Sequence, residues 1–231
     1  MGTPASDIIT IDGPVASGKS TVARELARRL GYRYLDTGAM YRALALAAQR
    51  AGVDMTSSQA LIDLLEHTDI RLDVSTGTTR VFIDGDEVTE AIRTPEVTEL
   101  TGFVAGCGPL RPHMVERQRE FARGGRVVAE GRDMGTVVFP DAAVKFYLDA
   151  SLEERVRRRA EEWKAKGLAP ARDQVRRDIQ ERDRRDQSRP VSPLRVPPGA
   201  VVIDSTGMTV AEVVERMLVH ARPLRKENPP S

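Results

Sequence analysis

Residues 13–20 read Gly-Pro-Val-Ala-Ser-Gly-Lys-Ser and match the pattern G-x-x-x-x-G-K-[ST] at every fixed position. A β-branched run, Ile-Ile-Thr-Ile-Asp at 8–12, precedes this stretch and predicts a buried strand. After it, apolar residues recur at helical spacing as far as Leu30, and Gly31 predicts the end of the helix. The chain therefore opens with a strand, a glycine-rich loop and a helix, which is the local structure of a phosphate-binding P-loop.

The residues of this loop suit a nucleoside triphosphate. Backbone N–H groups freed by the glycines and the positive end of the helix dipole surround a polyphosphate. Lys19 reaches the β- and γ-phosphates, and the hydroxyl of Ser20 binds Mg²⁺. The sequence thus predicts an ATP-binding site with Mg²⁺ held at Ser20. Its residues are Gly13, Pro14, Val15, Ala16, Ser17, Gly18, Lys19, Ser20 and Thr21.

Further strand and helix patterns alternate along the rest of the chain. Strands are expected at 34–36, 126–130, 144–148 and 201–204, and helices at about 39–49, 151–166 and 209–221. Strands that alternate with helices are typical of a parallel sheet. We therefore predict an α/β fold whose parallel sheet is covered by helices on both faces.

Two segments differ from this core in charge. Residues 54–100 carry 11 acidic side chains against 3 arginines, a net charge of −8, and two β-like runs at 70–74 and 79–83 predict a hairpin there. Residues 153–189 carry 13 basic against 9 acidic side chains, a net charge of +4. An acidic insert and a basic helical segment attached to one core fit these counts. The tail from 222 onward, which contains three prolines, is expected to fray.

Composition limits the classes of function. The 231 residues include 35 Lys plus Arg and 34 Asp plus Glu, a net charge of +1, so no global field favours nucleic acid or a membrane surface. A single cysteine, Cys107, allows no intramolecular disulfide and suits a reducing cytoplasm. No run is as long as a membrane-spanning helix, and no heptad repeat indicates a coiled coil. We therefore expect a cytoplasmic monomer without a nucleic-acid or membrane partner.

Two classes of P-loop protein compete: a GTPase-type switch and a small-molecule kinase. The guanine-reading tetrapeptide Asn-Lys-x-Asp is absent. A kinase with an anionic acceptor needs several guanidinium groups to neutralise phosphate charge. Arg182, Asp186 and Arg189 recur at i, i+4 and i+7, which predicts one helical face. By themselves they also fit a solvated salt bridge. Their presence on a P-loop chain favours the kinase.

Four blocks of sequence resemble the bacterial type of cytidylate kinase. They are residues 11–21, Leu-Asp-Thr-Gly-Ala-Met-Tyr-Arg at 35–42, Gly-Arg-Asp-Met-Gly-Thr-Val-Val-Phe-Pro-Asp at 131–141, and 181–194. The similarity runs from about residue 7 to 221. It implies transfer of the γ-phosphoryl group of ATP to CMP or dCMP, giving ADP and CDP or dCDP. It also implies a P-loop kinase core (about 1–40, 105–152 and 190–221), an NMP-binding insert (about 41–104) and a helical lid (about 153–189), with a tail at 222–231. A kinase for UMP or dTMP is the alternative within this class, and a regulatory switch the alternative outside it.

The resemblance also implies a substrate site. The residues carried over are Thr37, Arg42, Gly102, Arg111, Arg132, Asp133, Arg182, Asp186 and Arg189. Of these, Arg132, Arg182 and Arg189 are expected to act in catalysis together with Lys19. Arg42 and Arg132 suit the acceptor phosphate, and an ionised Asp133 accepts a hydrogen bond from the cytosine amino group.

The resemblance implies a particular contact with CMP for several of the remaining residues. Arg111 would donate to the N3/O2 edge of cytosine, Arg182 and Asp186 would hold ribose and phosphate, and Arg189 would close over the transferring group. Gly102 replaces a family serine that helps to recognise the cytosine amino group, with Thr101 beside it as a possible source of a hydroxyl. Asp36 is expected to cap a helix, with a role through a Mg²⁺-bound water as the alternative.

Overall fold

The computed structural model describes residues 7–74, 79–165, 167–168 and 170–226, with the side chains of 222–226 left out. The chain divides into two compact units. The first contains residues 1–32 and 124–231, and the second contains 33–123. The second unit thus includes the segment 41–104 that the sequence analysis assigns to an insert, and extends beyond it at both ends.

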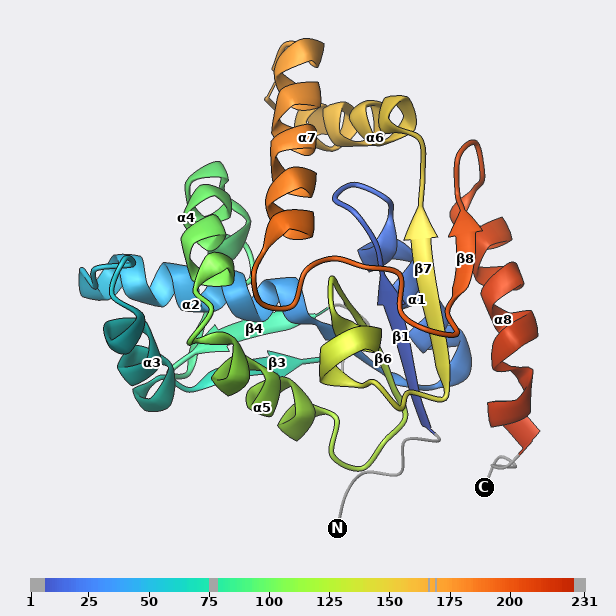
Figure 1. Cartoon of the computed structure of the whole chain (residues 1–231), viewed down its shortest axis with the longest axis horizontal. Helices are drawn as coiled ribbons and strands as arrows, with labels where there is room; N and C mark the ends of the chain where they lie inside the picture. The colour runs from blue at the N-terminus through green and yellow to red at the C-terminus, as the bar shows by residue number, and fades with distance from the viewer. Residues whose placement is uncertain (1–6, 75–78, 166, 169, 227–231) are drawn as a thin grey trace. The chain divides into compact units, whose positions relative to one another are not determined.

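Four strands of the first unit form a parallel sheet in the order β6-β1-β7-β8 (Figure 1). They are β1 (Ile8–Asp12), β6 (Val127–Gly131), β7 (Val144–Asp149) and β8 (Val201–Asp204). The register joins Ile11 to Glu130 on one side and to Phe146 on the other. Every residue of β1 and β6 is buried, as expected for the central strands of a parallel sheet. The predicted α/β fold is confirmed.

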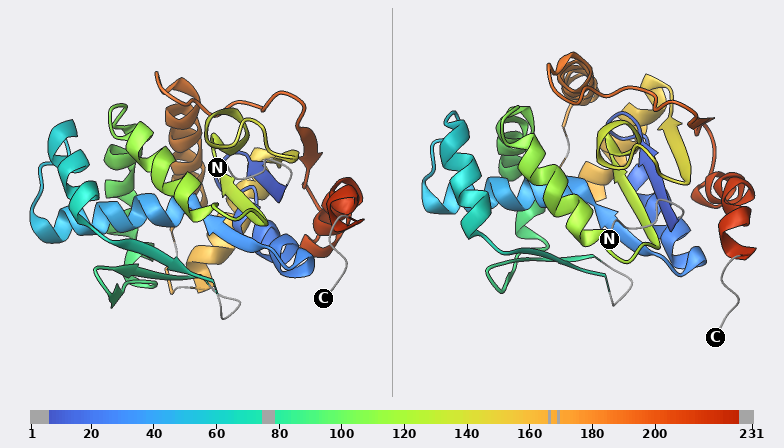
Figure 2. Two further views of the ribbon diagram at one scale, coloured as in Figure 1. Left: turned by 90° about the horizontal axis from the view of Figure 1, so that it is seen from below. Right: turned by 60° about the horizontal axis from the view of Figure 1, so that its bottom comes forward.

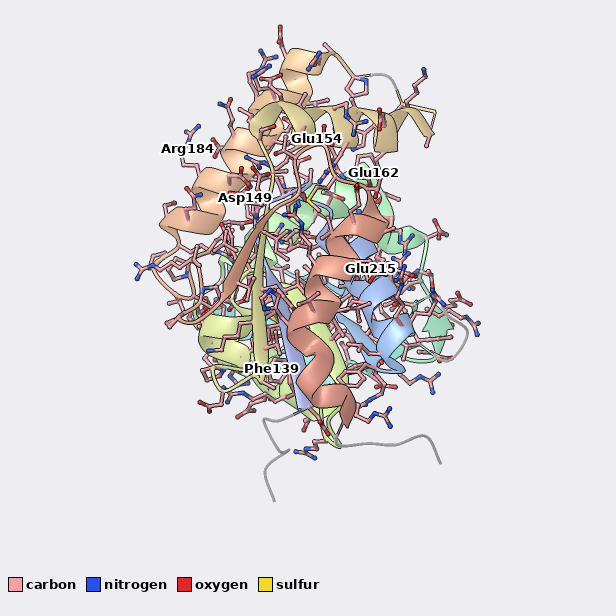
Figure 3. All side chains as sticks on the ribbon, turned by 90° about the vertical axis from the view of Figure 1, so that its right-hand side faces the viewer. Phe139, Asp149, Glu154, Glu162, Arg184 and Glu215 are labelled. Carbon is pink, nitrogen blue, oxygen red and sulfur yellow. The ribbon has the colours of Figure 1, made fainter. Side chains whose placement is uncertain are left out.

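Two helices cover this sheet. Helix α1 (Lys19–Leu30) contacts β6 and α8 (Val210–Lys226), and α8 contacts β7. In Figure 3, Glu215 marks α8 in front of the sheet, and this side chain forms an ion pair with Arg29 of α1. Helix α8 continues to Lys226. The prediction that the helix ends at 221 and that the chain frays from 222 is therefore wrong as far as 226, and residues 227–231 lie outside the described part of the chain.

A π-helical turn, η3 (Met134–Val138), follows β6 and contacts both β1 and β6. Its residue Gly135 is enclosed, because a Cβ there would lie 2.9 Å from the Cγ of Pro197 and from the Oγ1 of Thr10. A side chain has no room at this position. The backbone after β6 is therefore held against β1 and the segment before β8.

Helices α6 (Leu152–Ala165) and α7 (Arg172–Ser188) occupy the expected lid segment and pack against each other. Val156, Val175 and Ile179 form an apolar cluster with Val15 of the P-loop. In Figure 3, Glu154 of α6 lies above the end of β7, which Asp149 marks. The two helices are thus packed directly on the tip of the P-loop.

The second unit begins with β2 (Arg33–Asp36) and consists mainly of helices. These are α2 (Thr37–Ala51), α3 (Ser58–His67), the short η2 (Ala91–Arg93), α4 (Pro95–Gly106) and α5 (Arg111–Phe121). A small sheet in the order β3-β4-β5 completes it, with strands Ile70–Asp73, Arg80–Ile83 and Asp86–Glu87. Strands β3 and β4 are antiparallel and both contact α2 (Figure 2). The predicted hairpin is confirmed, although its expected turn at 75–78 lies outside the described residues.

Candidate active site

The P-loop joins β1 to α1 in a conformation that depends on its glycines. A Cβ on Gly13 would lie 2.1 Å from the carbonyl oxygen of Leu148 in β7, so the neighbouring strand excludes any side chain there. Gly18 has a φ of 93°, a left-handed conformation that glycine adopts at no steric cost. Ala16 is also left-handed, at 58°. No acidic residue stands in the first turn of α1, so the positive end of the helix dipole is left for an anionic ligand.

The ammonium group of Lys19 is buried within its own loop. The Nζ atom donates to the carbonyl oxygen of Pro14 at 2.6 Å and lies 3.4 Å from the Oγ of Ser17. Burial, followed by repulsion from Arg132, lowers the pKa of Lys19 below its usual value. Because the folded protein disfavours the charged form of Lys19, a polyphosphate ligand would stabilise this charge strongly.

Glu130 is a site residue that the sequence analysis missed. This buried side chain at the end of β6 accepts a hydrogen bond of 2.7 Å from the hydroxyl of Ser20. The proposed Mg²⁺ ligand thus has a carboxylate directly beside it. The available signal was an acidic residue in an otherwise apolar strand, a position where burial needs a partner.

Arg132 and Arg189 share the carboxylate of Asp186. The Nε of Arg132 donates to Asp186 Oδ2 at 2.7 Å, and Arg189 Nη2 lies 3.2 Å from Oδ1. Burial lowers the pKa of Arg132, but Asp186, Glu130 and Asp183 together raise it by more, so the guanidinium stays charged. Burial raises the pKa of Asp186, but Arg132, Arg189 and Arg182 together lower it by more, so this carboxylate stays ionised. These residues form a fixed charged cluster of two arginines and one carboxylate.

The expected single helical face for Arg182, Asp186 and Arg189 is only partly right. Helix α7 ends at Ser188, and Arg189 follows it with φ −55° and ψ 134°, outside the helix. Its guanidinium reaches back to Asp186 because the chain turns there, and Leu194 N donates to the carbonyl oxygen of Asp186 at 2.8 Å. The i+7 spacing is therefore not the reason that Arg189 meets Asp186.

Helix α7 is also bonded to the P-loop. Asp183 Oδ1 accepts from the N–H of Val15 at 3.2 Å, and its other oxygen pairs with Arg155, a buried residue of α6. Arg158 donates to the carbonyl oxygen of Ser17 at 3.0 Å and to that of Ser205 at 2.7 Å. Arg155 and Arg158 both belong to the run 155–159, and their side chains face inward. The sequence pattern alone did not indicate this.

The second unit holds the remaining predicted residues. Asp36 caps α2 by accepting from the N–H of Ala39 at 2.8 Å, which confirms its capping role, and its second oxygen pairs with Arg42 at 3.1 Å. Thr37 is buried in the first turn of the same helix. Arg111 is 3% exposed, and its guanidinium donates to the carbonyl oxygen of Ala105 at 3.0 Å. Arg42 and Arg111 are thus both held in place by partners within this unit.

Gly102 lies in α4, where the neighbouring Thr101 has the nearest hydroxyl in the sequence. That hydroxyl donates to the carbonyl oxygen of Val97, four residues earlier, at 2.6 Å. A hydroxyl that donates its proton still has lone pairs to accept with. Thr101 therefore keeps the capacity to accept from an amino group, which is what replacement of the family serine would require.

Within the described residues, no group of three or more His, Cys, Asp or Glu side chains is arranged to hold a metal ion. Cys107 is half-buried beside the hydroxyl of Ser58, and His220 packs edge-on against Phe146. In the same part of the chain, no helix is long and apolar enough to cross a membrane.

The first unit thus contains a P-loop on a parallel sheet and a cluster of arginines, which is the arrangement typical of a P-loop kinase. Similarity to known proteins shows to which family of P-loop kinases the chain belongs. The sequence profile of the family described as cytidylate kinase matches residues 9–223. The chain belongs to the cytidylate kinase family.

Curated relatives extend over nearly the whole chain. The cytidylate kinase of Geobacillus kaustophilus is 50% identical and aligns over 91% of this chain and 94% of its own. Those of Caldanaerobacter subterraneus subsp. tengcongensis and Serratia proteamaculans are 46% and 44% identical. Their alignments cover 90% and 95% of this chain, and 92% and 96% of the relatives. The protein is therefore a nucleoside monophosphate kinase of this family.

Proposed function

We propose that the protein transfers the γ-phosphoryl group of ATP to CMP or dCMP, producing ADP and CDP or dCDP. The observation that carries this assignment is the charged cluster of Arg132, Asp186 and Arg189 in the unit that contains the P-loop. Phosphoryl transfer is catalysed mostly by positioning and by neutralisation of charge, and a P-loop with several held arginines supplies both. The direct test is phosphoryl transfer from ATP to a panel of nucleoside monophosphates.

Each residue has a role that follows from its chemistry. Residues 13–21 bind ATP, with Lys19 on the β- and γ-phosphates. Arg42 and Arg132 bind the acceptor phosphate, because the forked guanidinium group matches phosphate oxygens. Asp133 and Arg111 read the cytosine edge, with Gly102 and Thr101 near its amino group. Thr37, Arg182, Asp186 and Arg189 complete the CMP site, and Arg182 and Arg189 stabilise the transferring group.

Mg²⁺ fits the residues at the start of α1. The hydroxyl of Ser20 and the carboxylate of Glu130 are adjacent hard oxygen donors, the kind of ligand that this ion prefers. Mg²⁺ is usually bound by one or two protein oxygens together with phosphates, so no larger acidic cluster is needed. When bound, the ion neutralises charge on the phosphates of ATP. We assign Ser20 as its ligand and Glu130 as the carboxylate that orients this ligand.

The lid formed by α6 and α7 is proposed to close over bound nucleotides. Its 13 basic residues suggest mutual repulsion as a reason for the lid to open without nucleotides, but the ion pairs of the structure contradict that reason. Most of these residues are ion-paired with acids of the same segment or its neighbours. The pairs involve Arg155, Arg157, Arg158, Arg159, Arg172, Arg176, Arg184, Arg185 and Arg189. Closure is instead favoured by phosphates, which compete with carboxylates for the arginines.

Hydrogen exchange tests this lid. Addition of ATP and CMP together is expected to slow amide exchange in α6 and α7, because bound phosphates add partners for their arginines and closure excludes water. Peptides from β1 and β6, which are buried throughout, serve as the internal control and should exchange slowly in both states. Exchange in α6 and α7 that is unchanged by both nucleotides would show that Arg182 and Arg189 act from a fixed wall.

We also propose that the enzyme acts as a monomer in the cytoplasm, without a nucleic-acid or membrane partner. The arginine run 155–159 supports the part of this proposal that concerns nucleic acid. All four of its arginines have partners within the chain, including Glu154 and Glu162. A backbone-binding stripe would instead present unpaired guanidinium groups to phosphates. Size-exclusion chromatography with light scattering checks the monomer.

A further inference from the structure

Asp12 is a buried carboxylate to which the proposed chemistry gives no task. It is the last residue of β1 and directly precedes Gly13, the first residue of the P-loop. Its side chain is completely buried. Oδ1 accepts from the N–H of Met134 and Oδ2 from the N–H of Gly135, both at 2.8 Å. Both oxygens are therefore bonded to the backbone that follows β6.

Burial of the Asp12 carboxylate costs free energy of folding. Burial raises the pKa of Asp12 to about 6, although the two backbone hydrogen bonds oppose the shift. An apolar residue at the end of a buried strand avoids the cost of burying a charge. What the carboxylate provides, and an apolar side chain does not, is two directional bonds to adjacent N–H groups.

The backbone that Asp12 holds belongs to the proposed CMP site. Met134 and Gly135 begin η3, directly after Arg132 and Asp133. Asp133 has φ −140° and ψ 23°, and its carbonyl oxygen accepts from the N–H groups of Val137 and Val138. Pro197 and Thr10 also pack closely against Gly135, where a Cβ would lie 2.9 Å from each of them. The hydrogen bonds to Asp12 thus fix the backbone next to Asp133, and with it the direction in which the Asp133 side chain leaves the backbone.

We propose that Asp12 is a positioning residue that ties the base-reading segment 132–135 to the first residue of the P-loop. This inference rests on the proposed role of Asp133 in reading cytosine. Asp12 does not touch the substrate itself, because it is fully buried and both oxygens are occupied. It does not serve as a general base either, since the acceptor phosphate is already anionic and attacks without losing a proton to the protein.

The test is Asp12→Asn, which keeps the shape of the side chain. The asparagine amide has only one oxygen that can accept a hydrogen bond. Its NH₂ group would face the other backbone N–H group, so two donors would meet where the wild type has a hydrogen bond. Because a displacement of about 1 Å can cost roughly 100-fold in rate, we expect kcat/KM for CMP to fall about 100-fold. The loss should lie mainly in KM for CMP and should lower the preference for CMP over UMP. KM for ATP should stay near the wild-type value.

The control for a general loss of stability is Ile203→Ala in β8. Ile203 is buried in the same sheet and contacts no proposed site residue through a hydrogen bond, so its truncation lowers the melting temperature without moving the segment 132–135. We expect it to leave KM for CMP and the ratio of kcat/KM for CMP to that for UMP unchanged.

A second variant keeps the inference testable if Asp12→Asn fails to fold. Gly135→Ala leaves Asp12 intact and forces the held backbone to shift by its clash with Pro197 and Thr10. The same rise in KM for CMP, with KM for ATP retained, is expected. A folded variant of either kind with wild-type KM for CMP and wild-type preference would overturn the inference.

The outcome also separates this inference from the proposed function. If Asp133→Asn leaves the preference for CMP over UMP intact, the proposed base reading fails whatever Asp12→Asn does. If Asp133→Asn lowers the preference and Asp12→Asn changes neither KM for CMP nor the preference, only the positioning role of Asp12 fails.

Discussion

Replacement of Lys19 by alanine is expected to lower kcat for phosphoryl transfer by about 100- to 1,000-fold, the usual effect of removing one preorganised donor to a transition state. The ammonium group is the P-loop cation nearest to the expected β- and γ-phosphates. Its contacts in the structure are with Pro14 and Ser17 of the same loop, so the mutation disrupts no bond between distant elements. Steady-state kinetics with saturating ATP and CMP provides the measurement.

The stability of this variant gives an independent check. A pKa that is lower in the folded chain than in the unfolded chain means that the protonated form is disfavoured by folding. Near pH 7 the charge of Lys19 therefore lowers the free energy of unfolding, and its removal in Lys19→Ala should offset part of the packing that is lost with the buried side chain. Lys145→Ala, which removes the same charge from a half-buried position on β7, should retain wild-type kcat. Near-normal kcat in a folded Lys19→Ala variant would refute the assigned role.

Replacement of Asp133 by asparagine is expected to reduce the preference for CMP over UMP. An ionised carboxylate accepts from the 4-amino group of cytosine and repels the 4-oxo group of uracil, whereas an amide both donates and accepts. Discrimination of this kind is worth about 1–3 kcal/mol, which is roughly 5- to 150-fold in the ratio of kcat/KM. The measurement compares this ratio in the variant and in the wild type.

Asp141→Asn is the matched control for this variant. Asp141 is exposed and lies in the loop after η3, so the same chemical change there should leave the ratio at its wild-type value. If Asp133→Asn retains the full preference for CMP while Asp141→Asn behaves as expected, another residue reads the base. Arg111 would then be the leading candidate, because it is the other residue proposed for the cytosine edge.

The P-loop and the sheet around it were predictable because their signals are local. Glycines at 13 and 18 are required by a close contact with Leu148 and by a left-handed backbone, and these requirements are visible as a motif. The β-branched run at 8–12 indicates a buried strand by its own composition. The capping role of Asp36 was predictable for the same reason, since a cap and its N–H partner are three residues apart.

The contacts missed by sequence reasoning join residues that are far apart in the chain. Glu130 bonds to Ser20 across 110 positions, and Asp12 bonds to Met134 across 122. No spacing rule connects such pairs, because the fold brings them together. The error at Arg189 has a related cause. The i, i+4, i+7 pattern assumes one continuous helix through Arg189, whereas the helix ends at Ser188. The net charge of residues 153–189 did not indicate the ion pairs of their arginines, because a net charge does not show which acids lie within reach.

Selection of cytidine nucleotides by this P-loop kinase is checked by its specificity for the phosphate acceptor. The wild-type enzyme with ATP and Mg²⁺ is assayed for kcat/KM against CMP, dCMP, UMP, dTMP, AMP and GMP. We expect CMP and dCMP to be the best acceptors, with kcat/KM for UMP lower by at least the roughly fivefold that one hydrogen bond of about 1 kcal/mol provides. Equal kcat/KM for CMP and for UMP or another monophosphate, or binding of ATP without phosphorylation of any acceptor, would refute the selectivity for cytidine nucleotides.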